Sequence, residues 1–247
     1  MLELRNVSKH FGGVIATDDV TLDVKQGEVH ALIGPNGAGK TTLIAQVAGD
    51  LGSDRGAILF EGADITRAPQ HQRVRAGLAR SYQITSIFKR LSVLDNLALA
   101  VQARSGSSFS FWRPVAAEAA LVEEARAIAA EIGLSGREAA VAATLAHGEQ
   151  RALEVGLALA TRPRLVLLDE PTAGMGPEES QTMISLIERI RAQVAVLLVE
   201  HDMDAVFRLA DRISVLVSGR VIATGAPEAI RAHAEVRKAY LGESAAA

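Results

Sequence analysis

Apolar positions along the chain follow two periods, one typical of β-strands and one typical of α-helices. Short apolar runs that alternate or cluster between turns predict strands near both ends of the chain. The predicted strands lie at residues 2–4, 14–16, 20–24, 29–33, 57–60, 79–83, 165–168, 194–199, 213–217 and 221–223. Helical segments, of which the second is polar and basic, are predicted at residues 43–48, 67–77, 92–104, 116–132, 145–161, 177–191, 204–209 and 227–241.

Strands that alternate with helices indicate an α/β fold, in which a mostly parallel sheet carries helices on its faces. The runs at 165–168 and 194–199 are wholly apolar, as in strands that are buried on both faces. Residues 85–161 show no strand pattern, so we expect an inserted helical subdomain there. Ser92 and Asp95 have the spacing of a capping box at its first helix.

Composition narrows the class of protein. The chain has 247 residues, 49% of them hydrophobic, which is enough for a large core. A net charge of −3 gives no general electrostatic footprint for nucleic acid, and the absence of cysteine excludes disulfides and thiolate metal sites. Residues 1–5 lack the features of a signal peptide, and no apolar run approaches the ~20 residues that cross a bilayer. At a membrane, we therefore expect the protein to be held by a partner.

Residues 34–42 carry the clearest chemistry, because they match the phosphate-binding pattern G-x-x-x-x-G-K-[ST] at every fixed position. A predicted buried strand enters this loop and a helix leaves it, whose N-terminus favours an anion. Lys40 adds a cation for the β- and γ-phosphates, and Thr41 offers a hydroxyl to Mg²⁺. A glycine-rich turn without a ligand does not account for strand, loop and helix together. The residues expected at the phosphates are Gly34, Pro35, Asn36, Gly37, Ala38, Gly39, Lys40, Thr41 and Thr42.

Other candidate residues stand where predicted strands or helices begin or end. Asp169 and Glu170 end a buried strand, at the edge where an open parallel sheet binds ligands. His201 follows the next buried strand, and Gly148 lies at a helix start where a backbone N–H can approach an anion. Each has a structural alternative: solvated carboxylates, a structural histidine and a helix cap. Phe11 is either a core residue or a ring that stacks on a base.

Together these stretches resemble the nucleotide-binding subunit of an ABC transporter, over residues 2–242. Residues 34–42 resemble its Walker A loop, residues 165–169 its Walker B strand, and residues 145–150 its signature motif. Gln83 resembles the Q-loop glutamine, His201 the switch histidine, and Phe11 the adenine-stacking aromatic residue.

The resemblance implies one nucleotide-binding domain over residues 1–247. Its P-loop NTPase (RecA-like) core, with an N-terminal antiparallel β subdomain, covers about residues 1–84 and 162–225. The helical subdomain covers about residues 85–161, and a C-terminal helical tail covers residues 226–247. It also implies ATP hydrolysis with Mg²⁺. The implied catalytic residues are Glu170, His201 and Lys40, and the residues around Mg²⁺ are Thr41, Gln83 and Asp169. Ala146, Gly148 and Glu149 are implied to reach the nucleotide of a second cassette.

Residues 145–154, 170–177 and 239–242 look most like the branched-chain amino acid (or urea and amide) uptake branch. The lipopolysaccharide-export ATPase is a close relative. The resemblance implies a second cassette, identical or related, integral membrane permeases, and indirectly a solute-binding protein, at the cytoplasmic face of the inner membrane. The common signature has Ser where this chain has Ala146, followed by Gly where it has His147, and the common D-loop has Asp where it has Gly176.

Two other classes of function compete with a transport motor. A soluble ABC ATPase that acts on nucleic acid or ribosomes usually shows tandem cassettes, coiled coils or basic patches. This chain has one cassette, no sustained heptads and no basic block, so no nucleic acid partner is expected. A nucleotide-binding adaptor without hydrolysis would not need Lys40, Asp169, Glu170 and His201 together. The aromatic loop with Phe109, Phe111 and Trp112 is either packed core or a contact surface.

Overall fold

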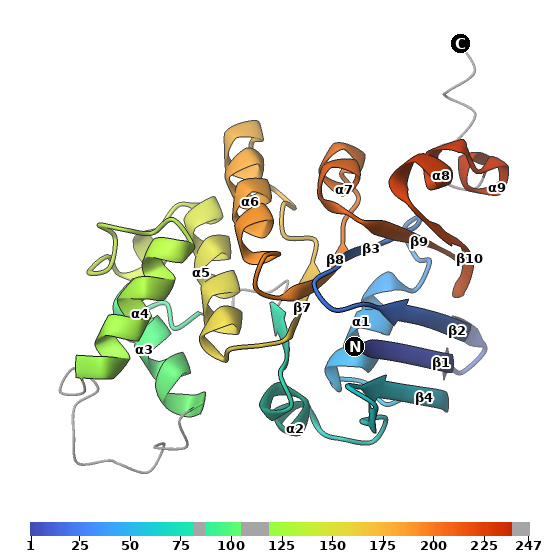
Figure 1. Cartoon of the computed structure of the whole chain (residues 1–247), viewed down its shortest axis with the longest axis horizontal. Helices are drawn as coiled ribbons and strands as arrows, with labels where there is room; N and C mark the ends of the chain where they lie inside the picture. Colours follow the sequence, from blue (N-terminus) through green and yellow to red (C-terminus); the bar gives the residue numbers. More distant parts are fainter. Residues whose placement is uncertain (82–86, 105–118, 239–247) are drawn as a thin grey trace.

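The computed structural model describes residues 1–81, 87–104 and 119–238 (Figure 1). The strands are β1 (Leu2–Phe11), β2 (Val14–Val24), β3 (Val29–Ile33), β4 (Arg55–Phe60), β5 (Ala63–Asp64), β6 (Leu78–Ser81), β7 (Leu165–Asp169), β8 (Ala195–Val199), β9 (Arg212–Val217) and β10 (Arg220–Gly225). The helices are α1 (Lys40–Ala48), α2 (Gln70–Arg75), α3 (Val93–Arg104), α4 (Ala119–Glu131), the 3₁₀ turn η2 (Ala142–Thr144), α5 (His147–Ala160), α6 (Pro177–Ile190), α7 (Met203–Leu209), α8 (Pro227–Ala232) and α9 (Ala234–Val236). Gln83, the aromatic loop and residues 239–242 lie outside the described residues.

The predicted α/β fold is confirmed by a central six-stranded sheet in the order β10-β9-β3-β8-β7-β6. All neighbours in it run parallel except β10, which pairs antiparallel with β9 across a tight turn. Parallel strands need crossover connections, and helices such as α6 and α7 supply them here. Their carboxyl ends therefore come together at one edge of the sheet, which we call the carboxyl edge.

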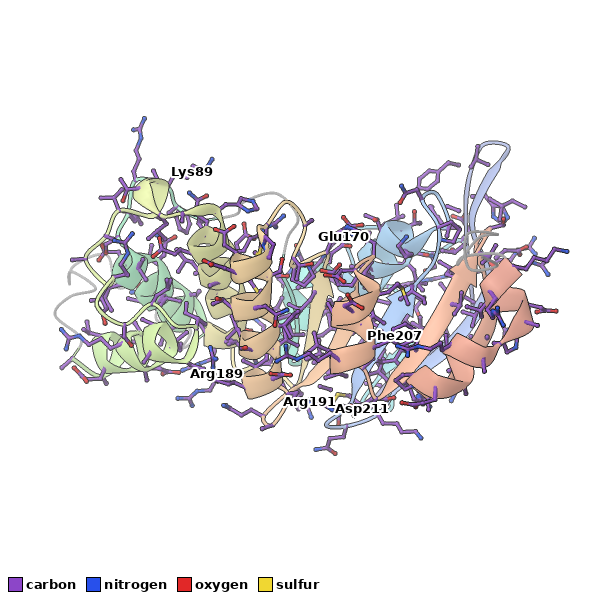
Figure 2. The ribbon with its side chains drawn as sticks, turned by 90° about the horizontal axis from the view of Figure 1, so that it is seen from above. Lys89, Glu170, Arg189, Arg191, Phe207 and Asp211 are labelled. Carbon is purple, nitrogen blue, oxygen red and sulfur yellow. The ribbon has the colours of Figure 1, made fainter. Side chains whose placement is uncertain are left out.

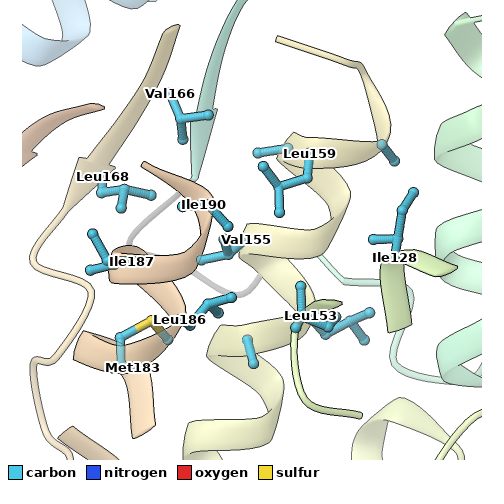
Figure 3. Close-up of a cluster of buried hydrophobic side chains, with 14 of the residues drawn as sticks. Ile128, Leu153, Val155, Leu159, Val166, Leu168, Met183, Leu186, Ile187 and Ile190 are labelled. Carbon is cyan, nitrogen blue, oxygen red and sulfur yellow. The ribbon is translucent and has the colours of Figure 1, made fainter. Parts of the chain in front are cut away.

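Strand β7 is wholly apolar up to its last residue because two separate cores cover its faces. Leu165 and Leu167 belong to a core with helix α1 and the N-terminal sheet. Val166 and Leu168 point into a second core, where helices α5 and α6 pack against the sheet (Figure 3). Strand β8 alternates in the same way. The two apolar runs thus have the burial on both faces that their sequences predict.

The N-terminal sheet is antiparallel, in the order β2-β1-β4-β5. The prediction of two separate strands at 14–16 and 20–24 is wrong, because β2 runs without a break from Val14 to Val24. The strand continues through the polar residues between the two apolar runs with register shifts: Thr17 pairs with Lys9 of β1. The Asp19 N–H donates to Ser8 Oγ (3.0 Å) of β1, and the Asp18 N–H donates to the Gly219 carbonyl (2.8 Å). Thr17 is buried there, and its hydroxyl donates to Gln46 Oε1 (2.9 Å) of helix α1.

Helices α3, α4 and α5 form the helical part of the molecule, which lies beside the central sheet (Figure 1). Their apolar side chains belong to the same core as one face of the sheet. At the start of α3, Ser92 Oγ accepts the Asp95 N–H (3.0 Å), and its hydroxyl donates to the Asp95 carboxylate (2.6 Å). Ser92 therefore caps the helix as its sequence predicts.

Two predicted helices are shorter in the structure. The segment predicted at 67–77 is helical only over α2, since Pro69 precedes its first turn. The tail predicted as one helix from 227 breaks at His233 into α8 and α9. Among the described residues, no helix combines the length and the apolar character that crossing a membrane requires.

Helix α1, which leaves the phosphate-binding loop, is fixed at its far end by Arg73. This buried guanidinium donates to the carbonyl oxygens of Gln46 (2.7 Å) and Val47 (2.8 Å) at the last turn of α1. Burial lowers the pKa of Arg73, and the Asp50 carboxylate opposes that shift. A cation at the negative end of the helix satisfies its last carbonyls and holds the axis in place.

Candidate active site

The phosphate-binding loop lies tightly against two strands, and its glycines make that possible. A Cβ on Gly34 would lie 2.0 Å from the carbonyl oxygen of Leu216 in β9, and one on Gly39 would lie 2.0 Å from that of Ala16 in β2. Gly39 also has a left-handed backbone (φ 104°) directly before the first residue of α1. Only glycine fits at both places, so packing as well as approach to an anion explains the motif.

Lys40 is buried at the start of α1. Its ammonium donates to the carbonyl oxygens of Gly34 (2.7 Å) and Pro35 (3.1 Å), which keeps it inside the loop. Burial lowers the pKa of Lys40, and the carboxylates of Glu170 and Asp169 oppose that shift. The ammonium is therefore held at the loop by groups that a phosphate oxygen can replace.

A cleft of about 250 Å³ lies over the loop. It is lined by Val14, Ile15, Ala16, Asn36, Gly37, Ala38, Gly39, Lys40, Thr41, Thr42 and Glu170. Thr41 is exposed to it. The structure therefore brings the predicted phosphate loop and the predicted catalytic carboxylate to one opening.

Phe11 lies at the end of β1, next to the turn into β2, and its side chain is 50% exposed. The alternative that it belongs to the core is wrong. The Lys9 ammonium lies 5.6 Å from the centre of its ring. An exposed aromatic face on the strand pair that lines the cleft is available for stacking, and that role stays a prediction.

Asp169 ends β7 as a buried carboxylate whose two oxygens have different surroundings. Oδ2 accepts a hydrogen bond from Arg80 (2.9 Å), which also binds Asp50 (2.7 Å). Oδ1 is buried and accepts no hydrogen bond from the described part of the chain. A hard cation prefers such an oxygen ligand, so Asp169 Oδ1 and the Thr41 hydroxyl fit Mg²⁺.

Glu170 is the first residue beyond β7, and its backbone leaves the strand in the left-handed region (φ 49°). Its N–H donates to the Val199 carbonyl of β8 (2.8 Å), which fixes the turn to the sheet. Figure 2 shows Glu170 at the end of the sheet, between helix α6 and helix α1. The strand therefore ends between the two carboxylates, with Asp169 in β7 and Glu170 in the turn that follows.

His201 follows β8 at the same edge, and its side chain is 58% exposed. Directly before it, Glu200 is a buried carboxylate bound by backbone N–H groups of both neighbouring loops. The sequence interpretation gave Glu200 no role. An acidic residue directly after a wholly apolar strand was the only available signal.

The signature helix α5 begins at His147, and its N-terminus differs from the prediction. The Gly148 N–H does meet an anion, but one of its own chain: it donates to Glu179 Oε1 (3.1 Å) at the start of α6. The Glu149 carboxylate accepts the Ala146 N–H (2.9 Å) and pairs with Arg137 (3.0 Å).

Residues of the signature motif face a second opening, not the cleft over the loop. Ala146 and Gly148 line an apolar groove of about 250 Å³ together with Glu179, Met183 and Leu186. Within this one chain, the signature residues and the phosphate loop therefore belong to different surfaces. Gln83 lies outside the described residues.

Comparison with known proteins places this site in a family. Residues 17–173 match the family described as ABC transporter, and residues 220–246 match the one described as branched-chain amino acid ATP-binding cassette transporter. The chain belongs to the ABC transporter family. Its residues 34–42, 165–170 and 201 are thus parts of an ABC cassette, and the recognition made from the sequence is confirmed.

Curated relatives match this cassette over its full length. The high-affinity branched-chain amino acid transport ATP-binding protein BraF of Pseudomonas aeruginosa is 38% identical, over 99% of this chain and 98% of its own. The protein of the same description, LivG, from Escherichia coli K12 is 35% identical over 99% of this chain and 98% of its own.

Solved ABC cassettes share the fold. An ATP-binding cassette of an ABC transporter in its ADP conformation has a TM-score of 0.86 and 30% identity, covering 98% of this chain and 99% of that one. A dimeric structure of a bacterial ABC transporter cassette has a TM-score of 0.79 at 21% identity, over 92% of this chain and 99% of that one, and shows the shared fold.

Proposed function

We propose that this ABC cassette is the ATPase that powers import of branched-chain amino acids through separate membrane permeases. One observation carries the ATPase part: the loop with Lys40 and Thr41 and the carboxylate of Glu170 line one cleft. The solute rests on full-length similarity to relatives described as branched-chain amino acid transport proteins. Phosphoryl transfer to water needs positioning and charge stabilisation, which this edge of the sheet supplies.

Each side chain has a part in that reaction. Lys40 and the loop N–H groups bind the β- and γ-phosphates, and Phe11 stacks on the adenine. Glu170 orients the attacking water and accepts its proton, since it lines the cleft beside the loop. His201 contacts the γ-phosphate from the next loop, and Gln83 senses the same group.

Thr41 and Asp169 hold Mg²⁺, with Gln83 in its surroundings. When bound, the ion neutralises charge on the β- and γ-phosphates. Arg80 keeps one oxygen of Asp169 occupied, and the other oxygen is left to the ion or to its water. Thr41 is the neighbour of Lys40 in α1, so one helical turn supplies both contacts.

The proposal includes partners and a place. A second cassette, a copy or a related chain, brings Ala146, Gly148 and Glu149 to the nucleotide of the first. Permease subunits hold the pair at the cytoplasmic face of the inner membrane, and a solute-binding protein acts through them. The separation of the groove at α5 from the cleft over the loop supports this arrangement, because one chain does not bring the two together.

Transport by the intact organism tests the solute. Deletion of the gene should abolish high-affinity uptake of labelled leucine, isoleucine and valine. Wild type should restore that uptake, and Glu170→Gln, expressed at the same level, should not. Uptake of labelled urea and acetamide is measured in parallel. Loss of these two with normal leucine uptake would assign the chain to the urea and amide branch, and a defect in lipopolysaccharide export alone would assign it to that relative.

A further inference from the structure

Glu200 is a buried carboxylate that the reaction as described does not use. It directly follows β8, and only 1% of it is exposed. Within residues 1–81, 87–104 and 119–238, its ion-pair partner is the imidazole of His201, whose Nδ1 lies 3.6 Å from Glu200 Oε2. A carboxylate buried without a lysine or arginine is costly unless several donors satisfy it.

The two oxygens of Glu200 divide those donors between two loops. Oε1 accepts the backbone N–H of Thr172 (2.9 Å) and, in a short contact, the Thr172 hydroxyl. Oε2 accepts the backbone N–H groups of His201 (2.9 Å) and Asp202 (3.3 Å). One oxygen thus binds the loop after β7, and the other binds the loop after β8.

Each of these loops carries one side chain proposed for the reaction. Thr172 lies two residues beyond Glu170, in a turn closed by the Ala173 N–H on the Glu170 carbonyl (3.1 Å). A second bond, from the Met175 N–H to the Thr172 carbonyl (3.1 Å), continues the turn. A shift of Thr172 therefore moves the backbone of Glu170.

The other oxygen acts on His201 in two ways. It binds the N–H of His201, which fixes the backbone, and it lies near Nδ1 of the ring. A carboxylate beside Nδ1 favours the ring orientation that leaves Nε2 for another partner. Hydrogen bonds to a charged group are stronger than neutral ones, so this link is stiff.

We propose that Glu200 is a positioning residue that sets the places of Glu170 and His201 relative to each other. It acts through Thr172 on one side and through the backbone of its own loop on the other. The inference rests on the roles proposed above for Glu170 and His201. Misplacement of a reacting group by about 1 Å costs on the order of 10²-fold in rate.

Turnover and binding are measured separately in Glu200→Gln. This variant keeps the shape of the side chain but turns one acceptor oxygen into an NH₂ group that faces N–H donors. In Mg²⁺-ATPase assays we expect kcat to fall about 10–100-fold. The equilibrium Kd for ATP should stay within about twofold, because the phosphate loop is untouched.

A conservative pair at position 172 repeats the test from the other side of the link. Thr172→Val removes the hydroxyl at equal volume and should lower kcat, whereas Thr172→Ser keeps the hydroxyl and should restore most of it. This pair decides the question if Glu200→Gln does not fold. Glu28→Gln is the matched control, since Glu28 is also buried but lies at the opposite end of the central sheet. It should lower the unfolding temperature and leave kcat unchanged.

The outcomes separate the inference from the function on which it rests. Full turnover in Glu170→Gln would reject the proposed catalytic role. Loss of turnover in Glu170→Gln, with kcat within about twofold of wild type in both Glu200→Gln and Thr172→Val, would overturn the positioning role of Glu200. A fall in unfolding temperature without a fall in kcat would leave Glu200 a structural residue and overturn it as well.

Discussion

The two ends of the central sheet both carry buried carboxylates, and they hold them differently. At the amino ends of β3 and β9, acidic side chains pair with arginines. At the carboxyl edge, Glu200 is bound mainly by backbone N–H groups, whereas Asp169 pairs with Arg80. Figure 2 shows Glu170 at one end of the sheet and the pair of Arg191 and Asp211 at the other.

Glu28 illustrates the amino end. Its Oε1 pairs with Arg212 (2.7 Å) and lies 3.5 Å from His30 Nδ1, while its Oε2 accepts the Lys25 N–H (2.6 Å). Burial alone would raise the pKa of Glu28, but His30, the Lys25 N–H and Arg212 outweigh it and hold the pKa at about 2. Asp211, which is exposed, also accepts the Val29 N–H (2.8 Å) and pairs with Arg191 (2.5 Å). At this end of the sheet, arginines neutralise the carboxylates of Glu28 and Asp211, and these ion pairs stabilise the fold.

The carboxyl edge uses backbone donors for one buried carboxylate and an arginine for another. Glu200 is held by N–H groups, and Asp169 gives only one of its oxygens to Arg80. Backbone donors satisfy a carboxylate but carry no net charge, so the local field still favours a cation. The difference lies in the partners of single residues: Glu28 combines one backbone N–H with Arg212, whereas Glu200 has three backbone N–H groups and no arginine among the partners that the described residues supply. The edge proposed to bind a cation and a phosphate is therefore the one where a buried carboxylate keeps its charge without an arginine.

The largest effect expected at the carboxyl edge is that of Glu170→Gln. The variant should bind ATP as wild type does but lose about 10²–10⁴-fold in turnover, because it lacks the group that accepts the proton from water. Phosphate release measures turnover, and equilibrium titration measures binding. Hydrolysis within tenfold of wild type would show that another group is the base.

Lys40→Ala should weaken ATP binding itself by about 10–100-fold. It removes the side-chain cation that the loop supplies, and a charge-assisted hydrogen bond is worth about 1.5–3 kcal/mol. Titration with ATP checks this result, and Lys25→Ala, an exposed lysine away from the cleft, is the control. An unchanged affinity would contradict the assignment of the phosphate-binding loop.

Gly148→Asp should weaken the ATP-dependent dimer about tenfold or more in the Glu170→Gln background. A Cβ at this position would lie 3.0 Å from Glu179 Oε1, so the new carboxylate meets one that is already bound to the helix N-terminus. Like charges at close range repel each other. Size exclusion with and without MgATP, with permeases present, measures the dimer.

Two further variants sharpen this result. Ala146→Ser should leave the dimer equal or tighter, since the anion contact belongs to the backbone. Glu179→Gln should tighten it, because the Gly148 N–H then loses a charged acceptor of its own chain. Normal dimerisation of Gly148→Asp would reject a role of this helix end in the second cassette.

The smallest effect is expected at the amino end, in the pH dependence of Glu28→Gln. Because the folded-state pKa of Glu28 is held at about 2, below its ordinary value of 4.5, the contribution is present above pH 4.5 and is lost as the pH falls through about 2. Urea unfolding should show the variant less stable by about 1–3 kcal/mol at neutral pH, with the difference shrinking towards pH 2. A constant difference would show that the ionisation of Glu28 contributes nothing.

Much of this molecule follows from local patterns. Apolar runs of period two located the strands, and a run that is apolar throughout identified β7 as buried on both faces. The glycines of residues 34–42 identified the loop because its backbone geometry admits no other residue at Gly34 and Gly39. Each of these features depends on about ten consecutive residues, so the sequence alone predicts it.

What escaped the sequence consists of contacts between distant segments. Thr172 and Glu200 are separated by 28 positions, Gly148 and Glu179 by 31, and Arg80 and Asp169 by 89. Taken alone, each acidic partner has a common structural explanation. Glu200 and Asp169 are acidic residues at the end of a strand, and Glu179 is an acidic residue in the first turn of a helix. Pairing between distant segments also makes β2 one strand, because Ser8, Lys9 and Gly219 supply partners for residues 17–19 that the polar sequence there does not predict.

The left-handed backbone of Glu170 has a consequence for how this protein can change over generations. A side chain in that conformation costs on the order of 1 kcal/mol that glycine avoids. Glycine at position 170 therefore relieves this strain and, with the role proposed for Glu170, removes the group that accepts the proton from water. Selection of variants for heat resistance alone should therefore favour glycine at position 170. Selection for growth on scarce solute should disfavour it. With the role proposed for Glu170, stability and turnover therefore make opposite demands on this one position.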